Sequence, residues 1–190
     1  GETIWKTQRS ADFTEVPVHK RKAYGMPIVA PRGDATQLIS TGAQAVYSYD
    51  LKSGKELWKV RHHGWSIAPR PVYGHGMVYT TVDRDHPELW AIRLDGSGDI
   101  TESHVSWKVT QAMPPRCSPL LIDDLLYLIN RQGIASCLNA KTGEIVWKQR
   151  LNGMYSASPI DANGLIYCFN EDSTCTVIKP GSRLEVVAIN

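Results

Sequence analysis

Two segments of the chain share one pattern, a polar turn whose glycine is followed four residues later by a tryptophan. Leu138–Arg150 reads LNAKTGEIVWKQR, and Ser48–Val60 reads SYDLKSGKELWKV. In each segment we expect the end of one strand, a tight turn and a second strand that closes on the tryptophan. A turn-and-strand unit that recurs in this way indicates a repeat protein before it indicates any reaction.

Three kinds of residue keep a common spacing along the chain. Pro71, Pro119 and Pro159 are separated by 48 and 40 residues, Tyr79, Tyr127 and Tyr167 by the same 48 and 40, and Trp58, Trp107 and Trp147 by 49 and 40. In the last unit the tryptophan position, 40 residues beyond Trp147, holds Val187. A period of this length, with four short alternating segments in each unit, is typical of the blades of a β-propeller.

The predicted fold is therefore all-β, with about four blades of four antiparallel strands. The blades are expected at residues 26–60, 67–109, 118–150 and 157–189, and residues 1–25 as the closing strand of a preceding blade plus a loop. We expect the first strand of each blade at 26–29, 68–73, 118–121 and 157–160, with a proline inside it, and a long turn at 95–99. A sheet with two apolar faces cannot bury both alone, so neighbouring blades must pack face to face.

Charge and hydropathy exclude several classes of partner. The chain has 21 basic and 19 acidic residues, a net charge of +2, which gives no basis for nucleic-acid binding. No apolar run approaches the length of a membrane span, so we expect none. The basic run His19–Lys22 is interpreted as a solvated loop.

The cysteines leave two interpretations open. Cys117, Cys137, Cys168 and Cys175 show no zinc-binding spacing. If Glu171-Asp172 is a two-residue hairpin turn, Cys168 and Cys175 face each other and could form a cross-strand disulfide. The alternative is a pair of small buried thiols on one face of a sheet.

No catalytic residues are predicted. His62-His63 is interpreted as a solvated pair at a strand end, because no further ligand lies at metal-binding spacing. Asp83-Arg84-Asp85 offers too few ligating groups for calcium. Asp123-Asp124 and Glu171-Asp172 are expected to occupy hairpin turns. Nucleophile-elbow, P-loop and dinucleotide fingerprints are not found in the sequence.

The repeats resemble the PQQ-like (quinoprotein alcohol dehydrogenase-like) β-propeller family from residue 26 onward. Its signature turn, Ala-x-Asp-x-x-Thr-Gly-Lys/Glu-x-x-Trp, is matched by Cys137–Trp147 and Ser48–Trp58, and its blade openings by Cys117-Ser118-Pro119 and Ala157-Ser158-Pro159. The insertion in the second unit is most similar to uncharacterised secreted bacterial members. The resemblance implies tryptophans docked between blades, a periplasmic or extracellular location, and about half of a typical eight-bladed ring, which a homodimer could complete.

Members of this family are either quinone- and calcium-dependent dehydrogenases or non-catalytic proteins. The dehydrogenases carry adjacent cysteines and a calcium-binding set of Glu and Asn with a catalytic Asp, and this sequence has no adjacent cysteines and no such set. We therefore predict a non-catalytic module without a cofactor that binds a protein, peptide or glycan through loops preceding the first strands. The alternative is a fragment of a dehydrogenase that uses pyrroloquinoline quinone (PQQ) and calcium. The predicted partner-binding residues combine aromatic rings and fixed charge: Trp65, Arg70, Arg116 and Tyr155.

Overall fold

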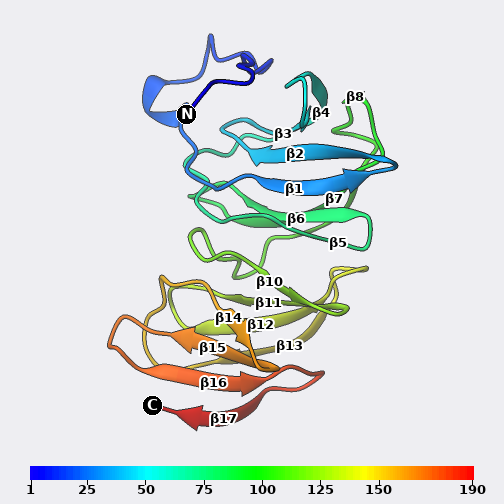
Figure 1. Ribbon diagram of the computed structural model, residues 1–190. Helices are drawn as coiled ribbons and strands as arrows, with labels where there is room; N and C mark the ends of the chain where they lie inside the picture. The colour runs from blue at the N-terminus through cyan, green and yellow to red at the C-terminus, as the bar shows by residue number, and fades with distance from the viewer.

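Four antiparallel sheets follow one another along the chain in a computed structural model that describes residues 1–190. The first contains β1 (Ile28–Arg32), β2 (Ala35–Thr41), β3 (Ala45–Asp50) and β4 (Glu56–Arg61), and the second β5 (Val72–Gly74), β6 (Met77–Val82), β7 (Glu88–Arg93) and β9 (Val105–Val109). The third contains β10 (Leu120–Ile122), β11 (Leu125–Ile129), β12 (Ile134–Asn139) and β13 (Ile145–Arg150), and the fourth β14 (Ile160–Ala162), β15 (Leu165–Phe169), β16 (Cys175–Lys179) and β17 (Glu185–Ile189). Figure 1 shows the sheets stacked face to face from the N-terminal to the C-terminal end, so the predicted β-propeller architecture is confirmed.

Each innermost strand begins immediately after a proline, later than the sequence predicted. Pro27, Pro71, Pro119 and Pro159 precede β1, β5, β10 and β14, respectively. The prediction that these prolines lie inside the strands was wrong: each stands one residue before its strand, although an edge strand can hold a proline, as β1 holds Pro31. Strands β5, β10 and β14 have three residues each, whereas β1 has five.

Alternate residues of a strand pack against different neighbouring sheets. In β6, Val78 and Val82 belong to the apolar core shared with the first sheet, whereas Met77 and Tyr79 belong to the core shared with the third. All six residues of β6 are consequently buried. The face-to-face packing follows from the period of two along a strand when both faces are apolar.

An irregularity recurs at the same place in every sheet. The register between the third and fourth strands shifts at Ser48/Tyr49, Ala91/Ile92, Cys137/Leu138 and Val177/Ile178. Such a bulge increases the local twist of the outer strands. The sequence period therefore extends to backbone detail that the residue types alone did not reveal.

Tryptophans of the outermost strands dock on the polar turn of the following sheet. Trp107 Nε1 donates to the carbonyl oxygen of Ala140 at 3.1 Å, and a Cβ atom on Gly143 would lie 2.7 Å from the Trp107 ring. Trp147 Nε1 likewise donates to the carbonyl oxygen of Gly181 at 3.0 Å. The glycine of the turn is required because the indole occupies the space that a side chain would fill, and because Gly143 has φ of +77°.

The indole N–H of Trp58, the first of the repeated tryptophans, has an acceptor within its own sheet and not in the following one. Trp58 is fully buried, and its Nε1 donates to Gln37 Oε1 of its own sheet at 3.0 Å.

The insertion at 95–99, expected as a long turn, contributes a short strand, β8 (Gly98–Asp99), which pairs in parallel with β4. The first sheet therefore gains a fifth strand from the second repeat.

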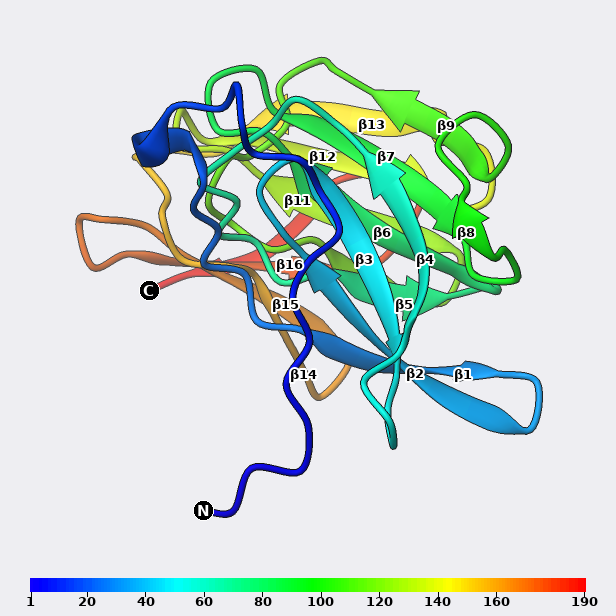
Figure 2. The ribbon, with the colours of Figure 1, turned by 90° about the horizontal axis from the view of Figure 1, so that it is seen from above.

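The N-terminal segment covers the free face of the first sheet without forming a strand. The closing strand expected within residues 1–9 is absent, and the one helical element is a three-residue 3-10 turn, Val18–Lys20. Trp5 Nε1 nevertheless donates to the carbonyl oxygen of Leu51 at 3.0 Å and its ring lies against Gly54, as the docked tryptophans do elsewhere. Figure 2, seen from above, shows this segment crossing the first sheet.

Cys168 and Cys175 lie on opposite faces of the fourth sheet. The hairpin between β15 and β16 is longer than two residues, so Cys168 pairs with Thr176 and Cys175 with Phe169. Directly paired residues share a face and successive residues alternate, which separates the two thiols. All four cysteines are free, so the predicted disulfide is absent. The alternative, two thiols on one face of the sheet, was wrong because the register places them on opposite faces.

Candidate functional site

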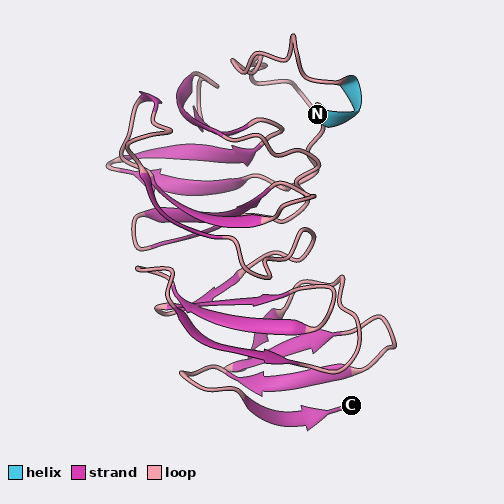
Figure 3. Cartoon of the chain, turned by 180° about the vertical axis from the view of Figure 1, so that it is seen from behind, coloured by secondary structure: helices cyan, strands magenta, loops and turns pink.

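Antiparallel strand order places two classes of loop on the same rim of the molecule. In each sheet the second and fourth strands finish at the same end. The turn from the second to the third strand and the linker to the next sheet therefore both lie at that end. Figure 3 shows the loops gathered at the two ends of the strands, and Figure 1 shows the C-terminal end of β17 on the same side as the turn between β15 and β16. We refer to this side as the linker rim.

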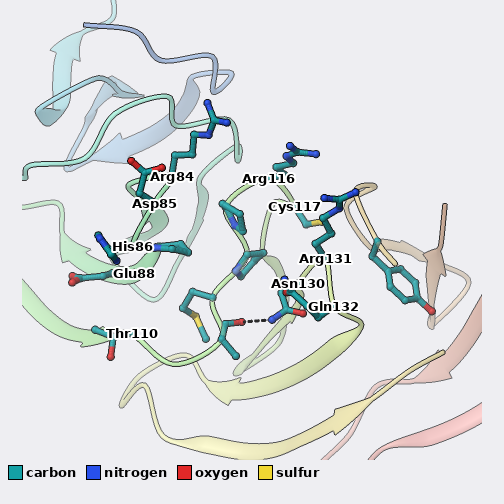
Figure 4. Close-up of a pocket in the computed structure, with 16 residues that line it drawn as sticks. Arg84, Asp85, His86, Glu88, Thr110, Arg116, Cys117, Asn130, Arg131 and Gln132 are labelled. Atoms are coloured by element: carbon teal, nitrogen blue, oxygen red, sulfur yellow. Dashed lines mark hydrogen bonds between the residues drawn. The ribbon is translucent and has the colours of Figure 1, made fainter. Parts of the chain in front are cut away.

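A hollow lies on the linker rim between the second, third and fourth sheets. Its volume is about 600 Å³. Four loops contribute to it: the β6–β7 turn, the β9–β10 linker, the β11–β12 turn and the β13–β14 linker. Figure 4 shows its lining residues. We call this feature the rim hollow.

Three arginines, Arg84, Arg116 and Arg131, line the rim hollow. Arg131 is paired with Glu171, with Nε and Oε1 3.6 Å apart. Arg84 and Arg116 are exposed and have no carboxylate partner. Figure 4 shows Arg116 and Arg131 on one side, with Asp85 and Glu88 on the other. Arg84 lies beside Asp85, so cationic groups stand on both sides of the hollow.

Both carboxylates on the opposite side accept hydrogen bonds from buried or half-buried indoles. Trp65 Nε1 donates to Asp85 Oδ2 at 3.0 Å, and Trp90 Nε1 donates to Glu88 Oε2 at 2.6 Å. These bonds fix the positions of the carboxylates. The two acids therefore support the walls of the hollow.

Buried side chains form the floor of the rim hollow. Met113 and Tyr155 are 3% and 1% exposed, and they lie beside Pro114. Asn130 connects two of the loops, because its Nδ2 donates to the carbonyl oxygen of Ala112 at 3.3 Å while its Oδ1 accepts from the N–H of Ile134 at 3.0 Å (Figure 4). A preformed floor reduces the entropy lost when a ligand is bound.

The only thiol in the hollow is not poised for nucleophilic chemistry. Cys117 is 1% exposed, and burial raises the pKa of its thiol to about 11. Because the thiolate is the reactive form, this cysteine stays protonated and unreactive near neutral pH. The Tyr155 hydroxyl is also engaged, donating to the carbonyl oxygen of Asn152 at 3.0 Å.

The structure brings together two of the four predicted partner-binding residues. Arg116 and Tyr155 line the rim hollow, Arg116 at its mouth and Tyr155 as part of its floor. Trp65 lies outside and supports the hollow through Asp85. Arg70 lies elsewhere, beside the innermost strands.

The sequence reasoning missed the residues that the turns between second and third strands contribute. Four such residues line the hollow: Arg84 of the β6–β7 turn, Glu88 at the start of β7, and Arg131 and Gln132 of the β11–β12 turn. The prediction considered only the linkers before first strands. The alternating direction of successive strands was the available signal, because it places these turns on the same rim as the linkers.

His62 is buried, in contrast to its predicted solvated position. It is 6% exposed, its ring meets that of Trp90 edge-on with 6.1 Å between centroids, and its Nδ1 accepts from the N–H of Gly64 at 3.0 Å. Burial lowers the pKa of His62 to about 4. His62 is therefore a neutral structural residue, whereas His63 is exposed as predicted.

The innermost strands do not present the ligands of a calcium–quinone site. The hollow between β1, β5 and β10 is lined by apolar side chains such as Val29, Tyr73 and Leu121, and Arg70 is its one charged residue. Calcium takes carboxylate and carbonyl oxygens, which these side chains do not offer. No three His, Cys, Asp or Glu side chains anywhere in the chain are grouped to hold a metal ion. These residues therefore do not fit the cofactor of the dehydrogenases.

The fold and the repeated docked tryptophans define a β-propeller built from PQQ-type blades. The chain belongs to the PQQ-like repeat family: the family model described as outer membrane protein assembly factor BamB matches residues 1–115 and 99–183. No curated protein matches the chain closely enough to count as a relative. The structure also has no helix of the length and apolarity needed to cross a bilayer.

Several solved structures share the fold. BamB from Moraxella catarrhalis is 13% identical with a TM-score of 0.63, over 85% of this chain and 48% of that one. The quinohemoprotein alcohol dehydrogenase ADHIIG from Pseudomonas putida HK5 is 16% identical with a TM-score of 0.66, over 90% and 34%. A europium-containing methanol dehydrogenase is 14% identical with a TM-score of 0.60, over 84% and 40%. The chain thus spans half or less of the length of each, and the likeness shows the fold alone.

Proposed function

We propose that this chain is a non-catalytic, cofactor-free propeller module that binds a protein or peptide partner in the rim hollow. The observation that carries the proposal is the hollow itself, a preformed space of about 600 Å³ assembled by loops of three consecutive blades. Pockets with an apolar floor and a few placed polar groups are the usual form of binding sites.

The chemistry of the lining supports binding over catalysis. Burial raises the pKa of the Cys117 thiol, which therefore stays protonated. Asp85 and Glu88 each accept a hydrogen bond from an indole N–H. No side chain in the hollow is paired with a second group that would activate it as a nucleophile or base. The description of the matching family as an outer membrane protein assembly factor supports a protein partner and a periplasmic or extracellular location.

A glycan partner is less well supported than a peptide. Sugar binding commonly uses an exposed aromatic face, but the ring of Trp65 is already approached by Arg84 Cζ at 5.5 Å, Lys20 Nζ at 5.9 Å and the edge of His19. The hydroxyl of Tyr155 is bonded within the chain. The Trp65 ring and the Tyr155 hydroxyl, the aromatic groups that a sugar would contact, are therefore already engaged within the chain.

A variant that fills the hollow tests the proposal. Gln132 is exposed on the β11–β12 turn, and Gln132→Trp would place an indole in the hollow. Ser182→Trp, on the exposed β16–β17 turn of the opposite rim, is the matched control. Peptides selected from a random displayed library should bind the wild type and Ser182→Trp equally and Gln132→Trp at least about tenfold more weakly, a loss of about 1.4 kcal/mol. Equal binding to all three proteins, or no selected peptide, would refute it.

A second copy of the chain is proposed as a partner that completes the ring. The fourth blade exposes Ile160, Phe169, Val187 and Ile189, which are 53%, 43%, 52% and 64% accessible. Burial of such side chains would favour association. Light scattering should then give twice the chain mass of 21.2 kDa, and a monomer at high concentration would contradict this arrangement.

A further inference from the structure

We infer that the ligand of the rim hollow is an acidic peptide segment, whose carboxylates pair with Arg84 and Arg116 while its apolar side chains contact the floor. This inference rests on the proposed function and specifies the chemistry of the partner. It is carried by the arrangement of charge around the hollow, which is independent of the family resemblance.

The arginines differ in how far their charge is already compensated. Arg131 has Glu171 as a partner, with a separation of 3.6 Å. Arg116 makes no hydrogen bond or ion pair with another side chain, and Arg84 contacts only the face of Trp65 through its guanidinium group. Two guanidinium groups at the mouth of one hollow thus retain all their side-chain donors. A guanidinium group binds a carboxylate through two parallel N–H···O bonds, which makes it selective for acidic groups.

Arg84 is also held in place before any ligand arrives. Its Cζ lies 5.5 Å from the centroid of the Trp65 ring, and the indole is anchored by its bond to Asp85. A cation that stacks on an aromatic ring loses less freedom on binding than one that is free in solvent. The tryptophan that the sequence predicted as a contact residue therefore acts by positioning an arginine.

The floor favours a peptide over an acidic glycan. Met113, Pro114 and Tyr155 are apolar, with only a small area accessible from the hollow, and the side-chain amide of Asn130 is used within the chain on both of its atoms. A peptide can place a leucine or alanine on this surface next to an acidic residue. An acidic sugar polymer has carboxylates but no apolar side chain for the floor.

The inference is tested with defined probes. We would measure fluorescence anisotropy with a short labelled peptide of Asp and Glu alternating with Leu and Ala, and with its isostere in which Asn and Gln replace the acids. The variant combines Arg84→Gln with Arg116→Gln. The matched control combines Lys52→Gln with Arg183→Gln, which removes the same charge from exposed turns on the opposite rim, where the Arg183 side chain is 86% accessible.

The expected result is selective, salt-dependent binding of the acidic peptide. The paired arginine substitutions should weaken it about tenfold, and the control should leave it unchanged. Affinity should fall several-fold between about 50 mM and about 300 mM NaCl, because exposed charges are screened.

Several results would overturn the inference, and none of them would by itself end the proposed function. These are equal affinity for the amide isostere, an unchanged affinity in the arginine variant, and tighter binding of polygalacturonate, an acidic glycan, than of the peptide. Failure of the acidic peptide to bind at all has the same consequence. The proposed function is decided separately, by whether library-selected peptides lose affinity for Gln132→Trp.

Discussion

Acidification should destabilise this protein through His62 before its carboxylates titrate. Burial lowers the pKa of His62 from 6.5 to about 4 in the folded state, whereas in the unfolded chain it keeps its ordinary value near 6.5. Between these values the unfolded state binds one more proton than the folded state. The free energy of unfolding therefore falls as pH decreases from about 6.5 towards about 4, and the stabilisation is fully present only above the unfolded pKa.

The size of the effect follows from the two pKa values. Proton linkage with a shift from 6.5 to about 4 lowers the free energy of unfolding by about 2 kcal/mol between about pH 7 and about pH 5. Near pH 5 the slope approaches 1.4 kcal/mol per pH unit, the value for about one proton. Carboxylates contribute little in this range, because their unfolded pKa values lie near 4.

Urea unfolding followed by tryptophan fluorescence at a series of pH values measures this slope. The matched variant is His62→Asn, whose amide oxygen can still accept from the N–H of Gly64 but which carries no titrating group. We expect the wild type to lose about 2 kcal/mol more than the variant between about pH 7 and about pH 5. Parallel pH profiles for the two proteins would refute the assignment of His62 as a buried neutral residue.

Three further predictions follow from particular contacts. Gly143→Ala should destabilise the protein more than Gly164→Ala: both glycines have positive φ, +77° and +73°, but only at Gly143 would the new methyl group meet the docked Trp107. We expect about 1 kcal/mol for the backbone strain alone and about 2 to 3 kcal/mol with the displaced indole, measured by chemical unfolding, and equal losses would contradict the docking geometry. Cys168 and Cys175 should react as separate thiols under denaturing conditions without reductant, and a mass two hydrogens lower than the reduced chain would disprove their separation. Arg116→Ala should change the free energy of unfolding by less than about 0.5 kcal/mol, since Arg116 is exposed and unpaired, and a larger loss of stability in thermal melts would make it structural.

The candidate site was predicted only in part, because only some of its loops carry a recognisable sequence marker. The linkers before first strands carry proline and aromatic residues at regular spacing, so Arg116 and Tyr155 could be selected from the sequence. The arginines of the β6–β7 and β11–β12 turns carry no comparable marker. Arg84 and Arg131 reach the same hollow only because the second and third blades lie side by side.

The sequence also did not predict which single polar residues are buried. His62 follows a strand and precedes a glycine, a setting that is typical of exposed strand ends. It is buried because the ring of Trp90, contributed by the next blade, lies 6.1 Å away. A contact between repeats leaves no trace in the local pattern of either repeat.

The sequence by itself determined the repeated four-stranded unit, the face-to-face packing and the family, because each depends on period, turn chemistry and apolar alternation within one unit. The tertiary structure alone decided which loops share a rim, which arginines remain unpaired and which face each cysteine occupies. The physical reason is that local residues specify a blade, whereas a binding surface is made where separate blades meet. A shift of one residue in the β15–β16 register was enough to separate Cys168 from Cys175.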